Sequence, residues 1–426
     1  MWIVFIEIDP GFTRAFTAAK ELGLRILWIG RKLDDSFTSG DLCDKCVAVN
    51  ELTAEEITSA IQSIVATGNV SAVWTLKDQF VPLAAGLMQS LGCNGRFASP
   101  ELVATTKDKG MLRNALAGTP FNPWFKLIDL SKERNVERPL KGQTIVIKPP
   151  LGYSSIGVEK VKPDDDFQAA LARTSSILTK IAESVPGFAD QEFNPKTTVL
   201  IEQFVGGTEF SAEVFAHNGQ IECLGVCGKS EMVPPYFEEI SYCMPAPIDH
   251  ATTQRIMAAA VDIMGILGLS SGMAHVEVKV TESAVTVLDI GLRLGGSGLT
   301  HDLVHASTGI DLVKAVLAEL AGLNPEPYLT KMRTDIGLLY LLQVKDGGRL
   351  VRSPLAKADE GKDNPKELVN ARSFVGAGDQ LTGYPNYSGT PGFAFFHIPG
   401  SDRTAYCRAD ELLKEAAELF ALDYET

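Results

Sequence analysis

The sequence predicts a mixed protein of the α/β and α+β classes, with a parallel sheet in its N-terminal part. Two observations support this prediction. In the first hundred residues, short apolar runs alternate with segments of helical spacing, which is typical of βαβ units. From about residue 140 onward, apolar runs are separated by short turns, which is typical of hairpins. A chain of 426 residues is long enough for about two to four domains.

The N-terminal region, residues 1–98, is expected to form a Rossmann-like α/β domain. The expected strands are 2–8, 24–29 and 70–76, and the expected helices are 12–22, 53–66 and 81–91. Because the region lacks the G-x-G-x-x-G fingerprint, we expect no dinucleotide site in it.

The middle region, residues 99–330, is expected to alternate hairpins with helices, and a mobile lid is expected over about 141–203. One helix should run from Ser99-Pro100 to Leu116. The Asn218-Gly219 pair is a strong hairpin signal. The expected strands are 144–148, 158–161, 198–204, 210–216, 220–226, 273–280 and 284–290, and the other expected helices are 165–180 and 251–267.

The tail, residues 331–426, is expected to form an α+β segment that ends in a helix over 410–420. We also interpret Cys223 and Cys227 as core residues on one face of a strand.

The charge balance bears on the possible partners. Acidic residues outnumber basic ones by 53 to 39, and the formal net charge is −14. Because phosphate backbones repel such a surface, we expect no nucleic-acid partner. No run approaches the ~18 apolar residues of a spanning helix, and the first residues lack a basic leader, so we expect no membrane partner. Seven scattered cysteines fit a reducing compartment, which predicts a cytoplasmic location.

The first candidate site is a lysine before a glycine- and serine-containing loop. Lys148 ends an expected strand, and the loop covers residues 149–157. Glycines let a loop fold closely over a phosphate, serine hydroxyls and N–H groups donate to its oxygens, and lysine adds positive charge. This is not the P-loop pattern, whose lysine follows the glycines on a helix. The alternative is a plain glycine turn.

The second candidate is the strand end from Glu202 to Glu209. Backbone groups at a strand end can pair with the edge of adenine, and a carboxylate a few residues later can accept from both ribose hydroxyls. The alternative is a solvated strand end that carries two acids.

The third candidate is a hairpin with carboxylates on one face. Because side chains alternate along a strand, His275 and Glu277 share a face, and the turn places Glu277 opposite Asp289. On the return strand, Asp289, Gly291 and Arg293 share that face. Two converging carboxylates repel unless a cation lies between them, and oxygen ligands favour Mg²⁺. The alternative is a surface hairpin with exposed acids.

Taken in order, these clusters resemble the ATP-grasp family of carboxylate–amine ligases. The matching features are Lys109 in Lys-Asp-Lys-Gly-Met-Leu-Arg, a Gly-x-Pro-x-Pro-like stretch over 118–123, Lys148 with its loop, the hinge 202–209, Glu277, and Asp-x-x-x-Arg-x-Gly-Gly ending at Gly296. His-Val-Glu at 275–277 and Ser-Thr-Gly-Ile-Asp at 307–311 are most similar to the dipeptide-forming L-amino acid ligase branch. The resemblance covers residues 1–330 firmly and the tail loosely.

The resemblance implies ATP as a cofactor, together with Mg²⁺ or alternatively Mn²⁺. It implies these nucleotide-binding residues: Lys109 and Lys148 at the phosphates, Ser154 and Ser155 on the loop over them, Gln203 and Val205 at the adenine through backbone groups, Glu202 near its amino group, and Glu209 at the ribose.

The resemblance also implies the catalytic and metal residues. Glu277 and Asp289 should hold the metal, and Arg293 should stabilise the acyl phosphate and the tetrahedral state that follows, with Lys148 as the other catalytic residue. The expected substrate neighbours are Glu239, His275, Gly295 and Gly296.

One position departs from the family pattern. The family usually has Glu-x-Asn at the second metal position, and this chain has Asp289-Ile290-Gly291. Aspartate is shorter by one methylene, and glycine offers no side-chain ligand. Either a water takes the vacant place, since Mg²⁺ keeps several waters, or the metal shifts toward Glu277. The departure leaves open a nucleotide-binding protein without ligase chemistry.

The resemblance implies an ADP-forming ligase that joins two amino acids through an acyl phosphate. A ligase for another carboxylate or amine of a specialised biosynthetic pathway is the alternative. The expected partners are small molecules, and the family suggests a homodimer.

Two further motifs favour other functions. Gly268-Leu-Ser270-Ser-Gly272 satisfies the G-x-S-x-G of a serine hydrolase, with Asp302 and either His305 or His397 downstream. A nucleophile elbow needs a strand before the serine and a helix after it, and we expect the reverse order here. A Cys-x-x-Cys pair at 43–46 has no second pair at zinc spacing, so we assign it no metal.

Overall fold

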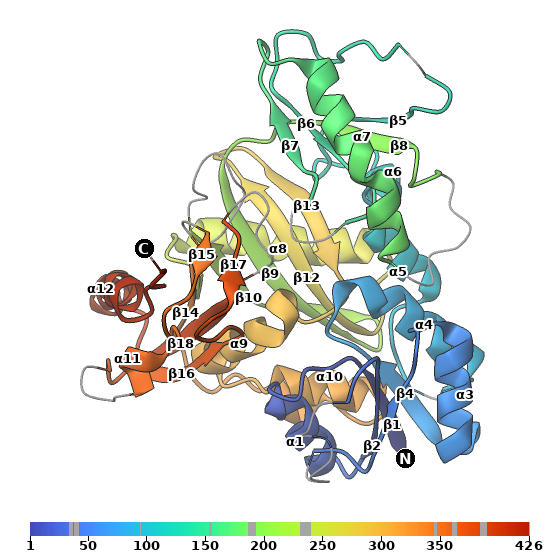
Figure 1. Cartoon of the computed structure of the whole chain (residues 1–426), viewed down its shortest axis with the longest axis vertical. Helices are drawn as coiled ribbons and strands as arrows, with labels where there is room; N and C mark the ends of the chain where they lie inside the picture. The colour runs from blue at the N-terminus through green and yellow to red at the C-terminus, as the bar shows by residue number, and fades with distance from the viewer. Residues whose placement is uncertain are drawn as a thin grey trace.

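A computed structural model describes residues 1–33, 37, 42–93, 95–133, 135–152, 156–185, 193–230, 240–344, 347–359, 364–383 and 390–425. These residues form four sheets. Figure 1 shows a small sheet at the top, the largest sheet in the middle and the N-terminal sheet at the lower right. The predicted α/β and α+β class is confirmed. Within the described ranges, no helix is both long and apolar enough to cross a membrane.

A parallel sheet forms the N-terminal part, as predicted, with the strand order β3-β2-β1-β4. Every residue of β1 is buried, which is typical of a parallel sheet covered on both faces. Thr53 caps α3 by accepting a hydrogen bond from the Glu56 N–H. The elements are β1 (Trp2–Ile6), α1 (Thr13–Glu21), β2 (Arg25–Gly30), β3 (Lys45–Ala48), α3 (Ala54–Ile64), η1 (Thr67–Asn69), β4 (Val70–Trp74), η2 (Asp78–Phe80) and α4 (Val81–Ser90).

The single helix predicted over 99–116 is wrong, because Asp108 divides it into α5 (Pro100–Lys107) and α6 (Lys109–Ala115). Asp108 has an extended backbone (φ −92°, ψ 111°), and its side chain accepts from the N–H groups of Gly110 at 2.7 Å and Met111 at 3.1 Å. Aspartate side chains compete in this way with helix continuation and start a new helix instead. Lys109 consequently stands at the first position of α6.

A small antiparallel sheet follows, in the order β5-β8-β6-β7, and lies at the top of Figure 1 with α7 against it. Ile147, Leu171 and Ile201 belong to its own hydrophobic core. It includes most of the predicted lid and one strand, β5, that the sequence analysis missed. The elements are β5 (Phe125–Asp129), β6 (Ile145–Lys148), β7 (Glu159–Val161), α7 (Phe167–Glu183) and β8 (Thr198–Gln203).

The central sheet has eight strands in the order β13-β12-β9-β10-β11-β14-β18-β16. The predicted hairpin is present, and Asn218 (φ 49°) and Gly219 (φ 79°) form its turn between β9 and β10. The predicted boundary at residue 330 lies between strands of this one sheet, so the tail extends it. The strands are β9 (Thr208–His217), β10 (Gln220–Lys229), β11 (Ser241–Met244), β12 (Gly272–Val280), β13 (Val285–Gly291), β14 (Ile336–Leu341), β16 (Leu368–Ser373) and β18 (Gly392–Ile398).

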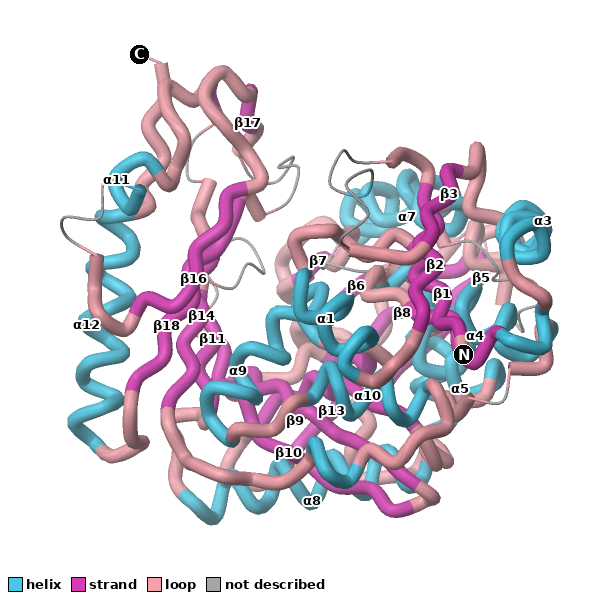
Figure 2. The backbone as a smooth tube through the Cα atoms, turned by 90° about the horizontal axis from the view of Figure 1, so that it is seen from below, coloured by secondary structure: helices cyan, strands magenta, loops and turns pink. Residues whose placement is uncertain are grey.

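Helices cover both faces of the central sheet. Along β14, Leu338 faces a core that includes α12, and Leu339 faces the opposite core, which includes α9. Figure 2 shows α12 beside β14, β16 and β18, at the end of the molecule opposite the N-terminal sheet. The helices are α8 (His250–Ile266), α9 (Leu299–Thr308), α10 (Leu312–Leu320), α11 (Ala356–Asp359) and α12 (Arg403–Leu419), with η3 (Gly295–Gly298), η4 (Glu326–Tyr328) and the short pair β15 (Gly348–Arg349) and β17 (Gln380–Leu381).

A β-bulge in β10 overturns the prediction that Cys223 and Cys227 share a strand face. The pairing of β10 with β9 shifts register between Cys223 and Gly225. The extra residue reverses the alternation of side chains, so Cys223 and Cys227 lie in different hydrophobic cores. Both are buried, as expected.

Candidate active site

A cavity of about 1030 Å³ lies where the N-terminal sheet, the small antiparallel sheet and the central sheet meet. Its lining runs from Glu7, after β1, to Phe393 on β18. Eleven of the predicted site residues line it: Lys109, Lys148, Glu202, Gln203, Val205, Glu209, His275, Glu277, Asp289, Arg293 and Gly296. The chain therefore brings together side chains that are far apart in the sequence.

Four other predicted site residues are placed differently. Gly295 lies beside the cavity, where an added Cβ would come 2.5 Å from His275 Nδ1, so only glycine fits there. Ser154, Ser155 and Glu239 lie outside the described residues.

Lys148 ends β6 and points its ammonium group at a buried carboxylate. Its Nζ lies 2.7 Å from Glu202 Oε2, and Arg113 Nε lies 2.6 Å from Glu202 Oε1. Burial alone would raise the pKa of Glu202, but the two cations outweigh it and lower that pKa to about 2. Burial also lowers the pKa of Lys148 to about 8, because Glu202 is shared with Arg113, which repels the ammonium.

Glu202 therefore has contacts other than those expected beside an adenine amino group: it holds Lys148 and Arg113. Gln203 is also partly used, since its N–H donates to the Trp124 carbonyl at 2.9 Å. Phe204 lies next along the chain, under Lys160 Nζ at 3.8 Å from the ring centroid.

Glu277 and Asp289 stand directly opposite each other in the β12–β13 register, as predicted from strand alternation. Both carboxylates meet lysines. Lys229 Nζ lies 2.7 Å from Glu277 Oε1 and 2.8 Å from Glu209 Oε1, and Lys109 Nζ lies 2.9 Å from Asp289 Oδ2. Burial would raise the pKa of Glu277, but Lys229 and His275 hold it well below its ordinary value.

The fully buried carboxylate of Glu213 holds the imidazole ring of His275 in place. Its Nδ1 lies 2.6 Å from Glu213 Oε1, and its Nε2 lies 3.5 Å from Glu277 Oε1. Burial would lower the pKa of His275, but Glu213 and Glu277 raise it to about 9, so the ring is an imidazolium at neutral pH. His275 thus places a positive charge beside Glu277.

Arg293 is joined to the N-terminal sheet through Asp78. Arg293 Nε lies 2.9 Å from Asp78 Oδ1, and Lys107 Nζ bonds the other oxygen of that carboxylate. Burial would raise the pKa of Asp78, but Arg293 and Lys107 hold it well below its ordinary value. The carboxylate fixes one edge of the guanidinium group at the cavity wall.

Five side chains of this network were not predicted from the sequence: Asp78, Lys107, Arg113, Glu213 and Lys229. Asp78 had a usable signal, because polar residues after parallel strands gather at one sheet edge. Arg113 ends the quoted Lys-Asp-Lys-Gly-Met-Leu-Arg motif. Glu213 and Lys229 carry no sequence signal that separates them from ordinary strand residues.

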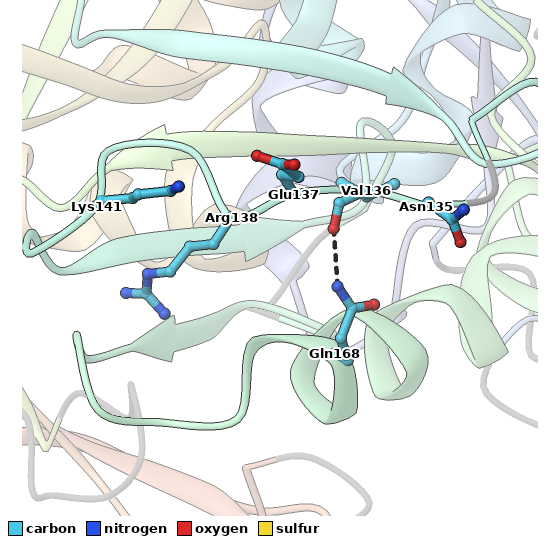
Figure 3. A pocket seen from close by; sticks show the side chains of 6 residues that line it. All are labelled: Asn135, Val136, Glu137, Arg138, Lys141 and Gln168. Carbon is cyan, nitrogen blue, oxygen red and sulfur yellow. Dashed lines mark hydrogen bonds between the residues drawn. The ribbon is translucent and has the colours of Figure 1, made fainter.

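A second, shallower pocket of about 430 Å³ lies on the small antiparallel sheet, away from every predicted site residue. Figure 3 shows Gln168 donating to the Val136 carbonyl at 2.8 Å and Arg138 beside it. Arg138 Nη2 donates to the carbonyls of Gln143 at 2.9 Å and Val161 at 3.1 Å, so this arginine holds two backbone segments together.

The local geometry does not fit the serine-hydrolase alternative. Ser270 is exposed, between helix α8 and strand β12, so the required strand–serine–helix order is reversed. Of the Cys-x-x-Cys pair, Cys43 is buried, and burial raises the pKa of its thiol to about 12, far from a reactive thiolate.

Comparison with known proteins places this geometry in a class. Residues 142–301 match the family model described as the ATP-grasp domain. The solved L-amino acid ligase from Bacillus licheniformis superposes with a TM-score of 0.82 at 22% identity, over 100% of this chain and 99% of that one. The fold is therefore that of an ATP-grasp protein.

Curated relatives match shorter parts of the chain. Human carnosine synthase 1 is 27% identical over 260 residues, 58% of this chain and 30% of its own length. The alanine–anticapsin ligase of Bacillus subtilis is 23% identical over 277 residues, 62% of this chain and 56% of its own. The chain thus spans about a third to somewhat over half of these relatives. The chain contains an ATP-grasp domain over residues 142–301, and the resemblance noted from the sequence is confirmed for these residues.

Proposed function

We propose that the chain is an ADP-forming carboxylate–amine ligase that joins two amino acids through an acyl phosphate. One observation carries the proposal: Lys109, Lys148, Glu277, Asp289 and Arg293 converge on one cavity of about 1030 Å³. The names of similar proteins support it, since they include an L-amino acid ligase and an alanine–anticapsin ligase.

The reaction has two steps. A carboxylate oxygen of the first substrate takes the γ-phosphoryl group of ATP, and the bond to ADP breaks. The amine of the second substrate then attacks the acyl carbon, loses a proton, and phosphate leaves with the former carboxylate oxygen. Such catalysis is mainly positioning and charge neutralisation. Lys109 and Lys148 are the expected phosphate partners, and Arg293 is the expected partner of the acyl phosphate.

The carboxylate pair fits a hard divalent cation. Glu277 and Asp289 supply oxygen donors from facing strands, the donor type that Mg²⁺ prefers while it keeps waters. Held by these two carboxylates, Mg²⁺ or Mn²⁺ would neutralise the negative charge of the ATP phosphates. Lys229 and Lys109, which now bond the two carboxylates, would exchange partners when the metal and nucleotide bind. No group of three or more possible metal ligands occurs among the described residues, so phosphate oxygens and waters would complete the shell.

The test is release of phosphate and ADP from MgATP across a matrix of amino-acid pairs, with mass spectrometry of the products. The expected result is release that needs two amino acids and a product mass equal to their sum less water. A response to one carboxylate with a non-amino-acid amine would favour the specialised-pathway ligase. Tight ATP binding without any turnover would favour the nucleotide-binding protein that Gly291 leaves open.

Two variants test the assignment of the site. Lys148→Ala and Glu277→Ala should abolish turnover while the circular dichroism spectrum and the melting temperature stay close to wild type. Lys126→Ala, an exposed lysine on the same small sheet that does not line the cavity, is the matched control and should keep turnover. Wild-type-like rates in either site variant would contradict the assignment.

The remaining finer predictions are a homodimer and a cytoplasmic location. The seven cysteines are all free, which supports a reducing compartment.

A further inference from the structure

One carboxylate in the cavity has no counter-ion. Asp302 lies in the first turn of α9, and its side chain lines the cavity with those of Leu299 and Leu303. It forms no hydrogen bond or ion pair with any described residue. The seven other described carboxylates of the cavity wall all have a basic partner.

The two acids at the same N-terminal side illustrate the contrast. Glu7 Oε2 lies 2.7 Å from Lys77 Nζ, and Asp9 Oδ1 lies 2.8 Å from Arg372 Nη2. Each of the seven acids therefore meets at least one basic group, some of these groups being shared, and Asp302 is the one acid without such a partner among the described lining residues. A cationic group of a ligand would supply the counter-ion that Asp302 lacks.

Apolar residues line the cavity on this side, among them Leu299 and Leu303 of the same helix. The Phe12 ring lies against Gly298 at the start of α9, where an added Cβ would come within 3.0 Å of it. On the other side α9 packs on β14, whose Leu339 lines the cavity. Burial raises the pKa of the Asp302 carboxyl to about 6. At pH 7–8 the group is therefore a carboxylate that has lost much of its hydration.

The ligand at this point is not the nucleotide. Phosphate groups are anions, and a carboxylate without a counter-ion repels them. A resident metal ion is also a poor fit, because Asp302 belongs to no group of three or more possible metal ligands within the described chain. A single carboxylate beside apolar side chains suits an ammonium group that carries an apolar substituent.

We propose that Asp302 binds the ammonium group of the acyl-donor substrate, an amino acid whose apolar side chain lies against Phe12, Leu303 and Leu339. The inference rests on the function proposed above and names one of its two substrates. We assign the ammonium site to the acyl donor and not to the attacking amine, because a protonated amine has no free electron pair. An amino group held as ammonium cannot attack, so it belongs to the substrate whose carboxylate is phosphorylated.

The test isolates the first step by trapping the acyl phosphate with hydroxylamine at pH 8. The donors compared are L-leucine and 4-methylpentanoate, which lacks only the amino group. In wild type, kcat/KM should favour leucine. Asp302→Asn should lower kcat/KM for leucine at least about 30-fold, the usual cost of removing one partner of a buried charge pair, and leave the value for 4-methylpentanoate nearly unchanged. Asp302→Glu should restore part of the preference.

The controls separate this role from a structural one. Asp262→Asn, an exposed acid on α8, should keep the leucine preference. The KM for ATP should be the same in Asp302→Asn as in wild type. Equal losses for both donors, or an unchanged preference in Asp302→Asn, would overturn the inference while the ligase function stands.

A binding measurement covers the case in which wild type has no ligase activity. The probe is 3-methylbutylammonium, which should raise the melting temperature of wild type and of Asp262→Asn but not of Asp302→Asn. If that pattern holds without turnover, the proposed function fails and the ammonium site stands. If the probe stabilises wild type and Asp302→Asn equally, the ammonium site fails.

Discussion

Lys148 and Arg113 share one carboxylate, Glu202, at a place almost closed to water. One carboxylate cannot neutralise two cations, so the pKa of one of the two basic groups is lowered. Arginine keeps its proton at any ordinary pH, and the lysine is therefore the group that gives way. Its proton affinity becomes a property of the site that ATP can change.

This arrangement predicts a pH dependence of ATP binding. Burial lowers the pKa of Lys148 to about 8, so below pH 8 the ammonium is formed before the nucleotide arrives. Above pH 8 the neutral amine must first take up a proton, and the Kd for ATP should rise by up to about tenfold per pH unit. Calorimetric titration from pH 7 to 10 measures this rise. Lys148→Arg stays charged and should bind ATP with a flat profile; an equally flat wild type would contradict the prediction.

Gly291 offers a second test at the scale of one residue. It stands opposite His275 in the β12–β13 register, and an added Cβ would meet Arg293 only at 3.6 Å, an ordinary contact. Gly291→Asn should therefore fold normally and add an oxygen ligand beside Asp289. We expect a lower Mg²⁺ concentration for half-maximal activity. Gly291→Leu is the control of similar size without a donor, and an equal effect in both variants would refute the explanation.

Strand alternation was enough to predict that Glu277 opposes Asp289. Lys148 at a strand end and Arg293 on the return strand were candidates from their positions, and the resemblance added Lys109 and the specific roles. The sequence could not reveal the partners of these groups, since Asp78, Glu213 and Lys229 come from other strands and turns and meet the site only after folding. Ion pairs of 2.6–2.9 Å between distant segments leave no periodic pattern in the sequence.

At the scale of elements, the first turn of α9 carries a cost in the free protein. Burial raises the pKa of Asp302 from 3.8 to about 6, so folding disfavours the ionised group. The pKa of Asp302 is higher in the folded than in the unfolded state. Its contribution to the free energy of unfolding therefore falls as pH rises from about 4 to about 6, and it stays destabilising above that pH. Asp302→Asn should raise the free energy of unfolding at pH 7.5 by on the order of 1–3 kcal/mol. Urea denaturation at pH 4 and 7.5 tests it: the gain should nearly vanish at pH 4.

Elements with clear periodicity were predicted well, and short or interrupted ones were not. Strands β1, β4 and β12 agree with their apolar runs to within two residues. Strands β3, β5 and β11 were missed, because each is short and depends on neighbouring strands for its pairing. The break at Asp108 and the bulge in β10 are local hydrogen-bonding choices that override an otherwise regular pattern.

At the scale of the molecule, one buried carboxylate joins the N-terminal region to the central sheet. Glu319 on α10 has no exposed surface, accepts from Ser271 Oγ, and lies 2.6 Å from His217 Nδ1. Arg96 adds a longer contact at 4.0 Å. Removing the carboxylate leaves the buried Ser271 hydroxyl and the partly buried His217 ring without this partner, which lowers the stability of the fold.

Glu319→Ala should therefore lower the free energy of unfolding by about 2–4 kcal/mol. Glu319→Gln keeps the shape and should cost less. Glu326→Ala, an exposed acid on the following 3-10 turn, should change stability by less than about 0.5 kcal/mol. Chemical denaturation of the three variants measures these free energies of unfolding. Similar midpoints for all three would show that Glu319 does not join the two parts.

The same helix has a consequence for synthesis. Val313, Val316 and Leu317 of α10 complete the hydrophobic core of the N-terminal parallel sheet, although they come long after β4 in the sequence. On a ribosome that adds about 5–20 residues per second, the sheet waits roughly 10–50 s for this helix after β4 is made. During that interval an apolar face of the nascent chain stays open to water and to other chains. Chaperone dependence should accordingly be greatest for chains stalled before residue 312 and fall sharply once α10 has emerged.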